Sequence, residues 1–274
     1  MRASLLPALV ASLLLTLTPP RLPADDAAVT PPKTRLVVAE KLLLHDDFSR
    51  PDLAKPWDAR AYAKHWSVRD GVLRGDGRVE GDRHAPVITC ELPARDALIA
   101  CRVRIPDGDP YLLLLVDGET ALGEKDHLLR FAMTNRQITF AQDLGPLASK
   151  RERQKRKADL AKQGLPLPPP TPAELADPAF HRTETIIRRP FSREANRWYS
   201  LTLEVVGTDA LVSIDGEPVL FGETKTLAAN KTLFHFLVAK GDIDIDDVQL
   251  WTASPSADFA EQRARLRGLF KPAP

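Results

Sequence analysis

Short runs of alternating apolar and polar residues make up most of the chain. In the run 199–205, tyrosine, leucine or valine occupies each odd position, and serine, threonine or glutamate each even one. A period of two is typical of a β-strand with one buried and one wet face. Comparable runs lie at 36–44, 65–69, 72–75, 87–92, 98–105, 111–116, 127–134, 137–142, 183–188, 211–214, 218–221, 232–238 and 243–251. About a dozen short strands without alternating helices predict an all-β sandwich of two sheets.

Asp-Gly pairs separate several of these runs. Asp70-Gly71 and Asp215-Gly216 each join two neighbouring runs. Both central residues of a type I′ turn need a positive φ, which Gly and Asp adopt more readily than other residues. The two pairs therefore predict tight hairpins. A third pair, Asp117-Gly118, follows the run 111–116 and carries the same turn signal.

The last run carries closely spaced carboxylates. Asp242, Asp244, Asp246 and Asp247 resemble the alternating acids that share the cleft face of one strand in jelly-roll glucanases, so Asp244 and Asp246 are candidate catalytic residues. A structural role is the alternative. Positions i and i+4 of a strand lie roughly 13 Å apart at Cα, whereas a retaining glycosidase needs carboxyl groups about 5 Å apart.

In the same run, the apolar residues change from odd to even positions. Ile243 and Ile245 fall on one face of a regular strand, and Val248 and Leu250 fall on the other. One extra residue at Asp246-Asp247 would restore the register. We therefore predict a β-bulge there, with all four apolar side chains buried.

The two cysteines flank a polar break between two predicted strands. An antiparallel hairpin centred between Arg95 and Asp96 would place Cys90 opposite Cys101, close to the separation that a disulfide needs. The pair is therefore a possible disulfide. Two buried thiols, or strands that are not neighbours, are the alternatives.

The N-terminus predicts export. Arg2 precedes an apolar run at 5–17, and Ala24 offers a cleavage site, so 1–24 is interpreted as a signal peptide and 25–35 as a flexible leader. An uncleaved anchor is the alternative. No other stretch is long and apolar enough to cross a membrane. We expect a secreted, periplasmic or cell-envelope protein whose sandwich spans 36–252.

An excursion at 145–182 interrupts the strand pattern. Six basic residues crowd between 150 and 157, and five prolines follow between 166 and 172. Neither part offers an apolar face, so we expect a weakly packed insertion, helical and then irregular, whose residues 150–172 are dispensable for stability. A patch for nucleic acid or anionic glycan competes with a solvated charged helix. The tail 253–274 predicts a short helix capped by Ser254, with Pro255 at its first position.

The order of several short motifs resembles a known family. These are Asp-Asp-Phe-Ser-Arg at 46–50, Trp-Ser-Val-Arg-Asp-Gly-Val-Leu at 66–73, Asp-Arg-His-Ala at 82–85, Arg-Trp-Tyr at 197–199, Ser-Ile-Asp-Gly at 213–216, Lys231 and Ile-Asp-Asp-Val-Gln-Leu-Trp at 245–251. Together they are similar to the secreted bacterial 3-keto-disaccharide hydrolases and, more broadly, to the concanavalin A-like lectin/glucanase fold. The resemblance covers about 42–252 without the excursion. It implies a jelly-roll sandwich of two antiparallel sheets that acts on carbohydrate.

Candidate site residues follow from the chemistry of sugar binding. His84 and His127 are candidates for proton transfer. Trp57, Arg130, Lys231 and His235 are candidates for stacking on a sugar or bonding its hydroxyls. A structural role is the alternative for each of them, and core roles are expected for Trp66 and Trp198.

Composition and motifs exclude several function classes. The net charge of +1 gives no global attraction to nucleic acid. No HExxH, Gly-x-Ser-x-Gly, CxxC or glycine-rich phosphate motif occurs, so no metal and no cofactor are expected. Two functions stay open: hydrolysis of 3-keto-glycosides, and non-catalytic glycan binding or cell-surface interaction. In either case we expect a monomer whose partner is a carbohydrate.

Overall fold

A computed structural model describes residues 29–79 and 84–270. The predicted signal peptide, with its cleavage site at Ala24, lies outside these residues. From Pro31 onward the chain forms a single unit. No helix in the described part of the chain is long and apolar enough to cross a membrane.

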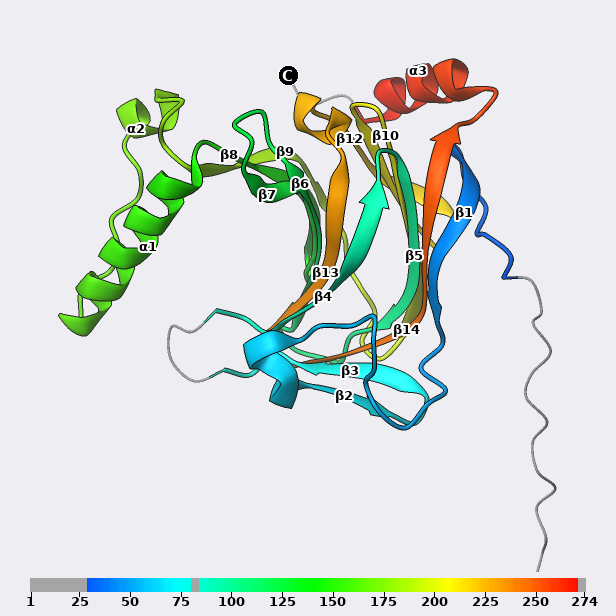
Figure 1. Cartoon of the computed structure of the whole chain (residues 1–274), viewed down its shortest axis with the longest axis horizontal. Helices are drawn as coiled ribbons and strands as arrows, with labels where there is room; N and C mark the ends of the chain where they lie inside the picture. Colours follow the sequence, from blue (N-terminus) through cyan, green and yellow to red (C-terminus); the bar gives the residue numbers. More distant parts are fainter. Residues whose placement is uncertain (1–28, 80–83, 271–274) are drawn as a thin grey trace, which may run out of the picture. The chain divides into compact units, whose positions relative to one another are not determined.

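In the described residues, fourteen strands form two antiparallel sheets, which confirms the predicted fold class (Figure 1). Sheet A has the order β12-β11-β10-β5-β14-β3-β2, with β1 also paired to β14. Its strands are β1 (Val37–Asp46), β2 (Trp66–Arg69), β3 (Val72–Asp76), β5 (Ala97–Arg104), β10 (Trp198–Val206), β11 (Asp209–Ile214), β12 (Glu217–Glu223) and β14 (Asp242–Pro255). Sheet B has the order β4-β13-β6-β7-β8-β9. Its strands are β4 (Val87–Ala94), β6 (Tyr111–Glu119), β7 (Lys125–Met133), β8 (Gln137–Leu144), β9 (Arg182–Pro190) and β13 (Lys231–Ala239).

The core lies between the sheets and takes every second residue of the inner strands. Phe234 and Phe236 of β13 are fully buried against the aliphatic side chains of β5 and β14. The predicted bulge is confirmed: the pairing of β14 with β5 shifts between Asp246 and Gln249, and Asp247 has a φ of 46°. Ile243, Ile245, Val248 and Leu250 are all buried, as the parity argument requires.

Two of the three Asp-Gly signals are turns. Asp70-Gly71 and Asp215-Gly216 have positive φ at both residues and close the predicted hairpins. Asp117-Gly118 instead lies inside β6 and pairs with β13 and β7. Glycine is needed there for space rather than for a turn, because a Cβ on Gly118 would lie 2.3 Å from the carbonyl oxygen of Asn230.

The predicted Cys90–Cys101 hairpin is wrong. β4 and β5 follow one another in the chain but belong to different sheets, so Cys90 pairs with Phe234 and Cys101 with Leu201. Both cysteines are free thiols in the core. Burial raises the pKa of each thiol, which keeps them protonated and unreactive.

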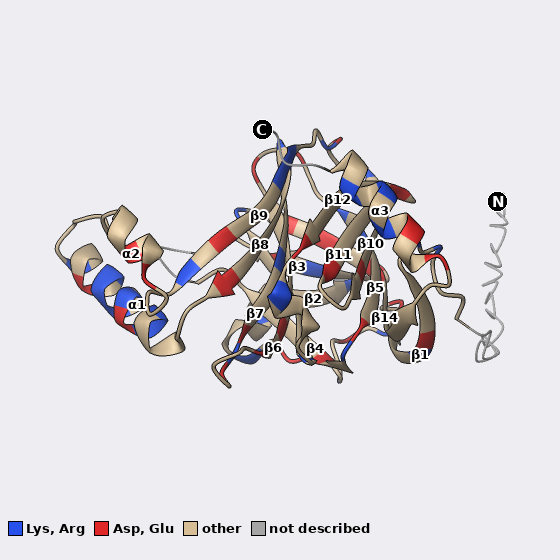
Figure 2. Ribbon diagram, turned by 90° about the horizontal axis from the view of Figure 1, so that it is seen from above, with Lys and Arg blue, Asp and Glu red and all other residues tan. Residues whose placement is uncertain are grey.

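Helices occupy the excursion and the tail. α1 (Leu147–Lys162) and α2 (Pro172–Ala176) lie between β8 and β9 and bury no residue; Figures 1 and 2 show them projecting beside sheet B. α3 (Phe259–Leu269) follows Asp258, and its Leu266 is buried. The predicted cap was wrong: Ser254 and Pro255 still belong to β14, because they pair with β1. Short 3-10 helices lie at η1 (Arg60–His65) and η2 (Lys225–Ala228).

Candidate functional site

Polar side chains gather on the outer face of sheet B, where alternation turns every second residue away from the core. His235 lies between the buried Phe234 and Phe236 of β13. A bulge in β7 helps to position the neighbouring histidine, because Val116 pairs with Leu129 whereas Asp117 pairs with His127. The extra residue, Leu128, is buried like Leu129. The bulge thus leaves His127 on the outer face beside β6.

Four of these side chains form a row across β4, β13, β6 and β7. Thr89 Oγ1 lies 2.7 Å from His235 Nδ1, and His235 Nε2 lies 2.9 Å from Asp117 Oδ2 at an angle that makes no hydrogen bond. Asp117 Oδ1 lies 2.5 Å from His127 Nδ1. Burial raises the pKa of Asp117, but the side-chain contacts from His127 and His235 outweigh it and hold the pKa well below its usual range. Asp117 is therefore a fixed negative charge between two imidazoles.

A second polar group lies beside this row, at the ends of β7 and β8. Lys150 of α1 places its Nζ 2.6 Å from Asp126 Oδ1 and 3.2 Å from Asp143 Oδ2. Arg130 donates to Asp143 at 2.9 Å, and His181 Nε2 lies 2.9 Å from Asp126 Oδ2. Burial raises the pKa of Asp126, but bonds from His181 and Lys150 lower it well below its usual range. Asp126 is thus ionised, and both carboxylates are paired with basic side chains.

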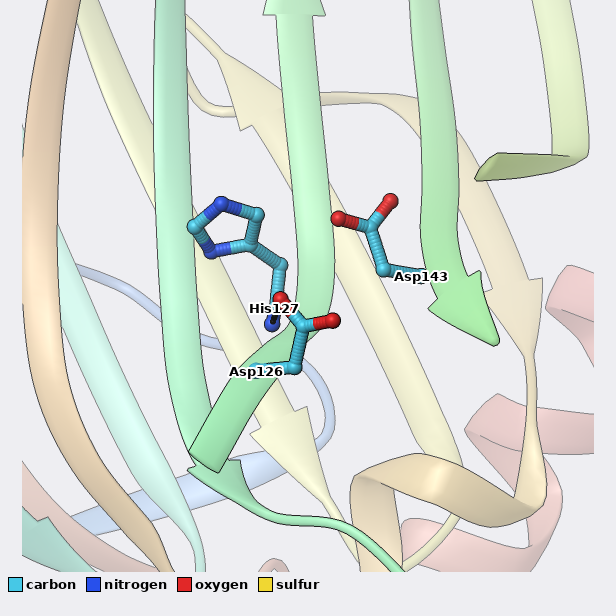
Figure 3. Close-up of side chains that lie close together, drawn as sticks. All are labelled: Asp126, His127 and Asp143. Carbon is cyan, nitrogen blue, oxygen red and sulfur yellow. Dashed lines mark hydrogen bonds between the residues drawn. The ribbon is translucent and has the colours of Figure 1, made fainter. Parts of the chain in front are cut away.

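Asp126, His127 and Asp143 have ligand atoms within 4.8 Å of one another, close enough to hold a metal ion (Figure 3). Two contacts compete with that role. The Lys150 ammonium already sits between the two carboxylates, and His127 Nδ1 is bonded to Asp117. A metal would have to displace the lysine, so we treat the group as an internal ion-pair network.

A pocket of about 320 Å³ opens over these groups. It is lined by His84, His127, Arg130, Asp143, Lys150, Arg153, Gln154, Lys157, Leu167, His181 and Thr183. His127 is partly exposed in this lining, and no residue in the described ranges hydrogen-bonds its Nε2. An imidazole oriented by a carboxylate through one nitrogen and free at the other is arranged to take a proton from a bound molecule.

Three sequence candidates meet in this pocket: His84, His127 and Arg130. His235 lies just behind them and supports Asp117. Sequence reasoning missed Asp117, Asp143 and Lys150. Asp117 was hidden by its Asp-Gly pattern, and Lys150 by its place in a run of basic residues.

Trp57 and Lys231 are not binding residues. Trp57 is only 6% exposed and donates from Nε1 to Asp46 Oδ2 at 2.7 Å, so its ring is unavailable for stacking on a sugar. Lys231 is buried and bonds the carbonyl oxygens of Arg95 and Leu227. Burial lowers the pKa of Lys231 to about 8.

Asp244 and Asp246 lie on the other sheet. Asp244 is held by Arg74 at 2.7 Å and by Arg104 at 2.7 Å, and Asp246 lies 3.4 Å from Arg102. Burial raises the pKa of Asp244, but both arginines lower it below its usual value. Asp244 is saturated by two arginines, whereas Asp246 has a single long contact and burial raises its pKa; both lie on sheet A and neither lines the pocket.

Comparisons with known proteins agree with the architecture. No family model matches the sequence, and no curated protein is significantly similar to it. Among solved structures, a glycoside hydrolase family 16 endo-glucanase from Bacteroides ovatus aligns with 76% of this chain and 99% of its own, at 13% identity and a TM-score of 0.50. LamA from Z. galactanivorans, in complex with laminaritriose and laminaritetraose, aligns with 78% of this chain and 100% of its own (12% identity, TM-score 0.49). The carbohydrate-binding module CBM66 from Bacillus subtilis aligns with 68% and 91%, respectively (11% identity, TM-score 0.43).

These likenesses concern the fold. The endo-glucanase shows that the chain has a jelly-roll sandwich fold, as the sequence predicted, and at 13% identity it shows the fold alone. Function has to be argued from the pocket itself.

Proposed function

We propose that the protein is exported and acts on carbohydrate at the outer face of sheet B, where it cleaves 3-keto-glycosides. The observation that carries the proposal is the Asp117–His127 pair, with His127 Nε2 available to a pocket that also holds Arg130 and Lys150. The fold shared with a glucanase and the sequence resemblance to 3-keto-disaccharide hydrolases support the substrate class.

The chemistry of a 3-keto sugar suits these groups. The C2 proton lies next to the carbonyl and is acidic, so a neutral imidazole can remove it. His127 Nε2 takes this proton, and the C2–H electron pair forms an enolate with negative charge on O3. Arg130 and Lys150 offer N–H donors toward that charge, although each also serves Asp143.

Collapse of the enolate completes the cleavage. The C1–C2 double bond forms, the bond from C1 to the glycosidic oxygen breaks, and the leaving oxygen takes a proton, with the protonated His127 as the nearest donor. Water then adds across the double bond and gives the free 3-keto sugar. Atoms and charges balance with water as the only co-reactant. Asp117 stabilises the imidazolium between the two proton transfers.

The test is release of an aglycone from a chromogenic 3-keto-glucoside by the mature protein. We expect turnover by the wild type and a loss of about 100- to 10,000-fold in His127→Gln. His45→Gln is the matched control, because His45 also pairs with an aspartate, Asp247, at 3.0 Å, but on sheet A.

The control should keep full activity. No release by the wild type across a panel of keto-glycosides, combined with binding of the intact sugars, would establish the non-catalytic glycan-binding function instead.

A further inference from the structure

The excursion between β8 and β9 adds two basic side chains, Arg153 and Lys157, to the lining of the pocket over His127. The pocket over His127 adjoins a pocket of about 350 Å³ between α1 and the proline-rich segment, because Arg153 and Leu167 line both. Pro168, Pro169 and Pro170 form a wall of the second pocket. The fixed φ angles of proline lower the conformational entropy that is lost when this wall becomes ordered, so the wall can persist without an apolar core of its own.

Basic side chains outnumber acidic ones in the lining of the pocket over His127. Arg130 and Lys150 are compensated by Asp143 and Asp126. Arg153 and Lys157, one turn apart on α1, line the same pocket and form no ion pair with any residue that the structure describes. Arg153 is held in place by Phe180, whose ring centre lies 5.3 Å from the guanidinium carbon. Two cations without a direct carboxylate partner among the described residues therefore line the pocket over His127, and Arg153 also interacts at longer range with Glu174.

We propose that Arg153 and Lys157 bind a negatively charged group, a carboxylate or a sulfate, on the part of the glycan that extends away from His127. This inference rests on the proposed function, because it assigns the substrate class to the same site. The excursion then determines specificity: His127 and Arg130 on the sheet act with Lys150 of α1 in the reaction, and Arg153 and Lys157 further along α1 select an anionic saccharide. Arginine and lysine are the usual partners of such anions in proteins.

A glycan fits the two adjoining pockets better than a nucleic acid does. Single-stranded nucleic acids are bound through successive aromatic platforms. The pocket over His127 offers only imidazoles, and in the second pocket Arg153 covers the Phe180 ring. An anion localised at one end of a short saccharide needs only Arg153 and Lys157.

α1 supplies its own matched control. Arg151 and Lys155 have the same spacing and the same charges as Arg153 and Lys157, are exposed, and line neither pocket. Arg153→Gln with Lys157→Gln should weaken binding of an anionic saccharide about tenfold, as two partly desolvated ionic contacts imply. Arg151→Gln with Lys155→Gln should leave binding within about twofold. Unfolding temperatures should be the same for both double variants, because α1 buries no residue.

The experiment is calorimetric titration of the full-length mature chain, with His127→Gln in every variant so that no probe is consumed. The probes are an oligogalacturonate, a sulfated oligosaccharide and a neutral laminari-oligosaccharide of matched length. Tighter binding of the oligogalacturonate or the sulfated probe than of the neutral one, lost only in the Arg153/Lys157 variant, supports the proposal. The better of the two anionic probes identifies carboxylate or sulfate.

Three results would overturn the inference. Equal affinity for the neutral and both anionic probes removes the cationic subsite. Equal losses in the two double variants show a diffuse charge effect. An RNA oligomer that binds as tightly, with the same dependence on Arg153 and Lys157, shows a general polyanion patch. If the wild type never cleaves keto-glycosides but the charge-dependent binding holds, the reaction is wrong and the cationic subsite stands.

Discussion

Each sheet of the sandwich carries a histidine paired with an aspartate, and the two pairs differ in their surroundings. On sheet B, Asp117 is 13% exposed and contacts a second imidazole, and His127 opens into the pocket. On sheet A, Asp247 is 42% exposed, and its partner His45 lines neither of the two adjoining pockets. Of the two pairs, only the first combines a part-buried carboxylate, whose pKa is held below its usual range, with an imidazole that lines the pocket.

The carboxylates on the two sheets also differ in the residues that neutralise them. Asp244 on sheet A is neutralised by Arg74 and Arg104, whose charges are permanent. Asp117 on sheet B is contacted instead by two histidines, His127 and His235. The carboxylate on sheet A that pairs with arginine therefore stabilises the structure, whereas the carboxylate on sheet B that pairs with histidine supports the proposed proton transfer.

The largest expected effect separates the two pairs in catalysis. Asp117→Asn should lower turnover of a 3-keto-glucoside about 100- to 10,000-fold, because the amide no longer orients His127 or stabilises its protonated form. Asp247→Asn should leave turnover unchanged. Initial rates of aglycone release from both variants check this; equal losses would show that the pairs do not differ in function.

The second effect is on stability in acid. Because the pKa of Asp117 is lower in the folded chain than in the unfolded one, its ionic contribution is present above about pH 4 and is lost as pH falls through the folded pKa. Asp117→Asn should therefore lower the free energy of unfolding at pH 7 by about 1–3 kcal/mol.

The difference in unfolding free energy between this variant and the wild type should become smaller below about pH 4. Urea unfolding across this pH range is the measurement. If the difference in unfolding free energy stays constant down to pH 2, Asp117 is not held ionised by its histidines.

The third effect concerns sheet A alone. Asp244→Asn leaves Arg74 and Arg104 without their carboxylate, and it should cost about 1–2 kcal/mol because both arginines are about one-third exposed. Turnover per folded molecule should not change. Thermal unfolding and rates, measured on the same preparation, check both parts; a selective loss of turnover would return Asp244 to the catalytic candidates.

The smallest expected effect on stability comes from the excursion. Replacing 151–172 by a short Gly-Ser linker keeps Lys150 and removes only residues outside the core, so the unfolding free energy should change by less than about 1 kcal/mol. Anionic saccharide binding should be lost. Calorimetry of unfolding measures the first expectation, and a loss as large as that of a core mutation would make the excursion part of the fold.

Much of the fold could be predicted because strands follow a local rule. Period-two alternation gave the strands, the two true Asp-Gly turns gave hairpins, and the change of parity between Ile245 and Val248 gave the bulge. The pairing of Cys90 with Cys101 failed because consecutive strands can enter different sheets.

The site was harder to predict because it is assembled from five strands and a helix. Asp117-Gly118 has the sequence of a turn, but Gly118 is required by the close approach of Asn230 within the sheet. Lys150 is one of several basic residues, and only its contacts with Asp126 and Asp143 distinguish it. Trp57 reads as a loop residue but fills the core against Phe48 and Phe236. Such roles depend on contacts distant in sequence, which local patterns do not encode.

The most direct test of the central claim is proton exchange at C2 of a 3-keto sugar, followed by NMR in deuterated water. The account predicts that the wild type and the His45→Gln variant wash out the C2 proton and that His127→Gln does not, although it still binds the sugar. Two results would contradict this account. One is C2 proton exchange that is undiminished in His127→Gln. The other is cleavage by the wild type with no C2 exchange in the recovered substrate and no deuterium in the product.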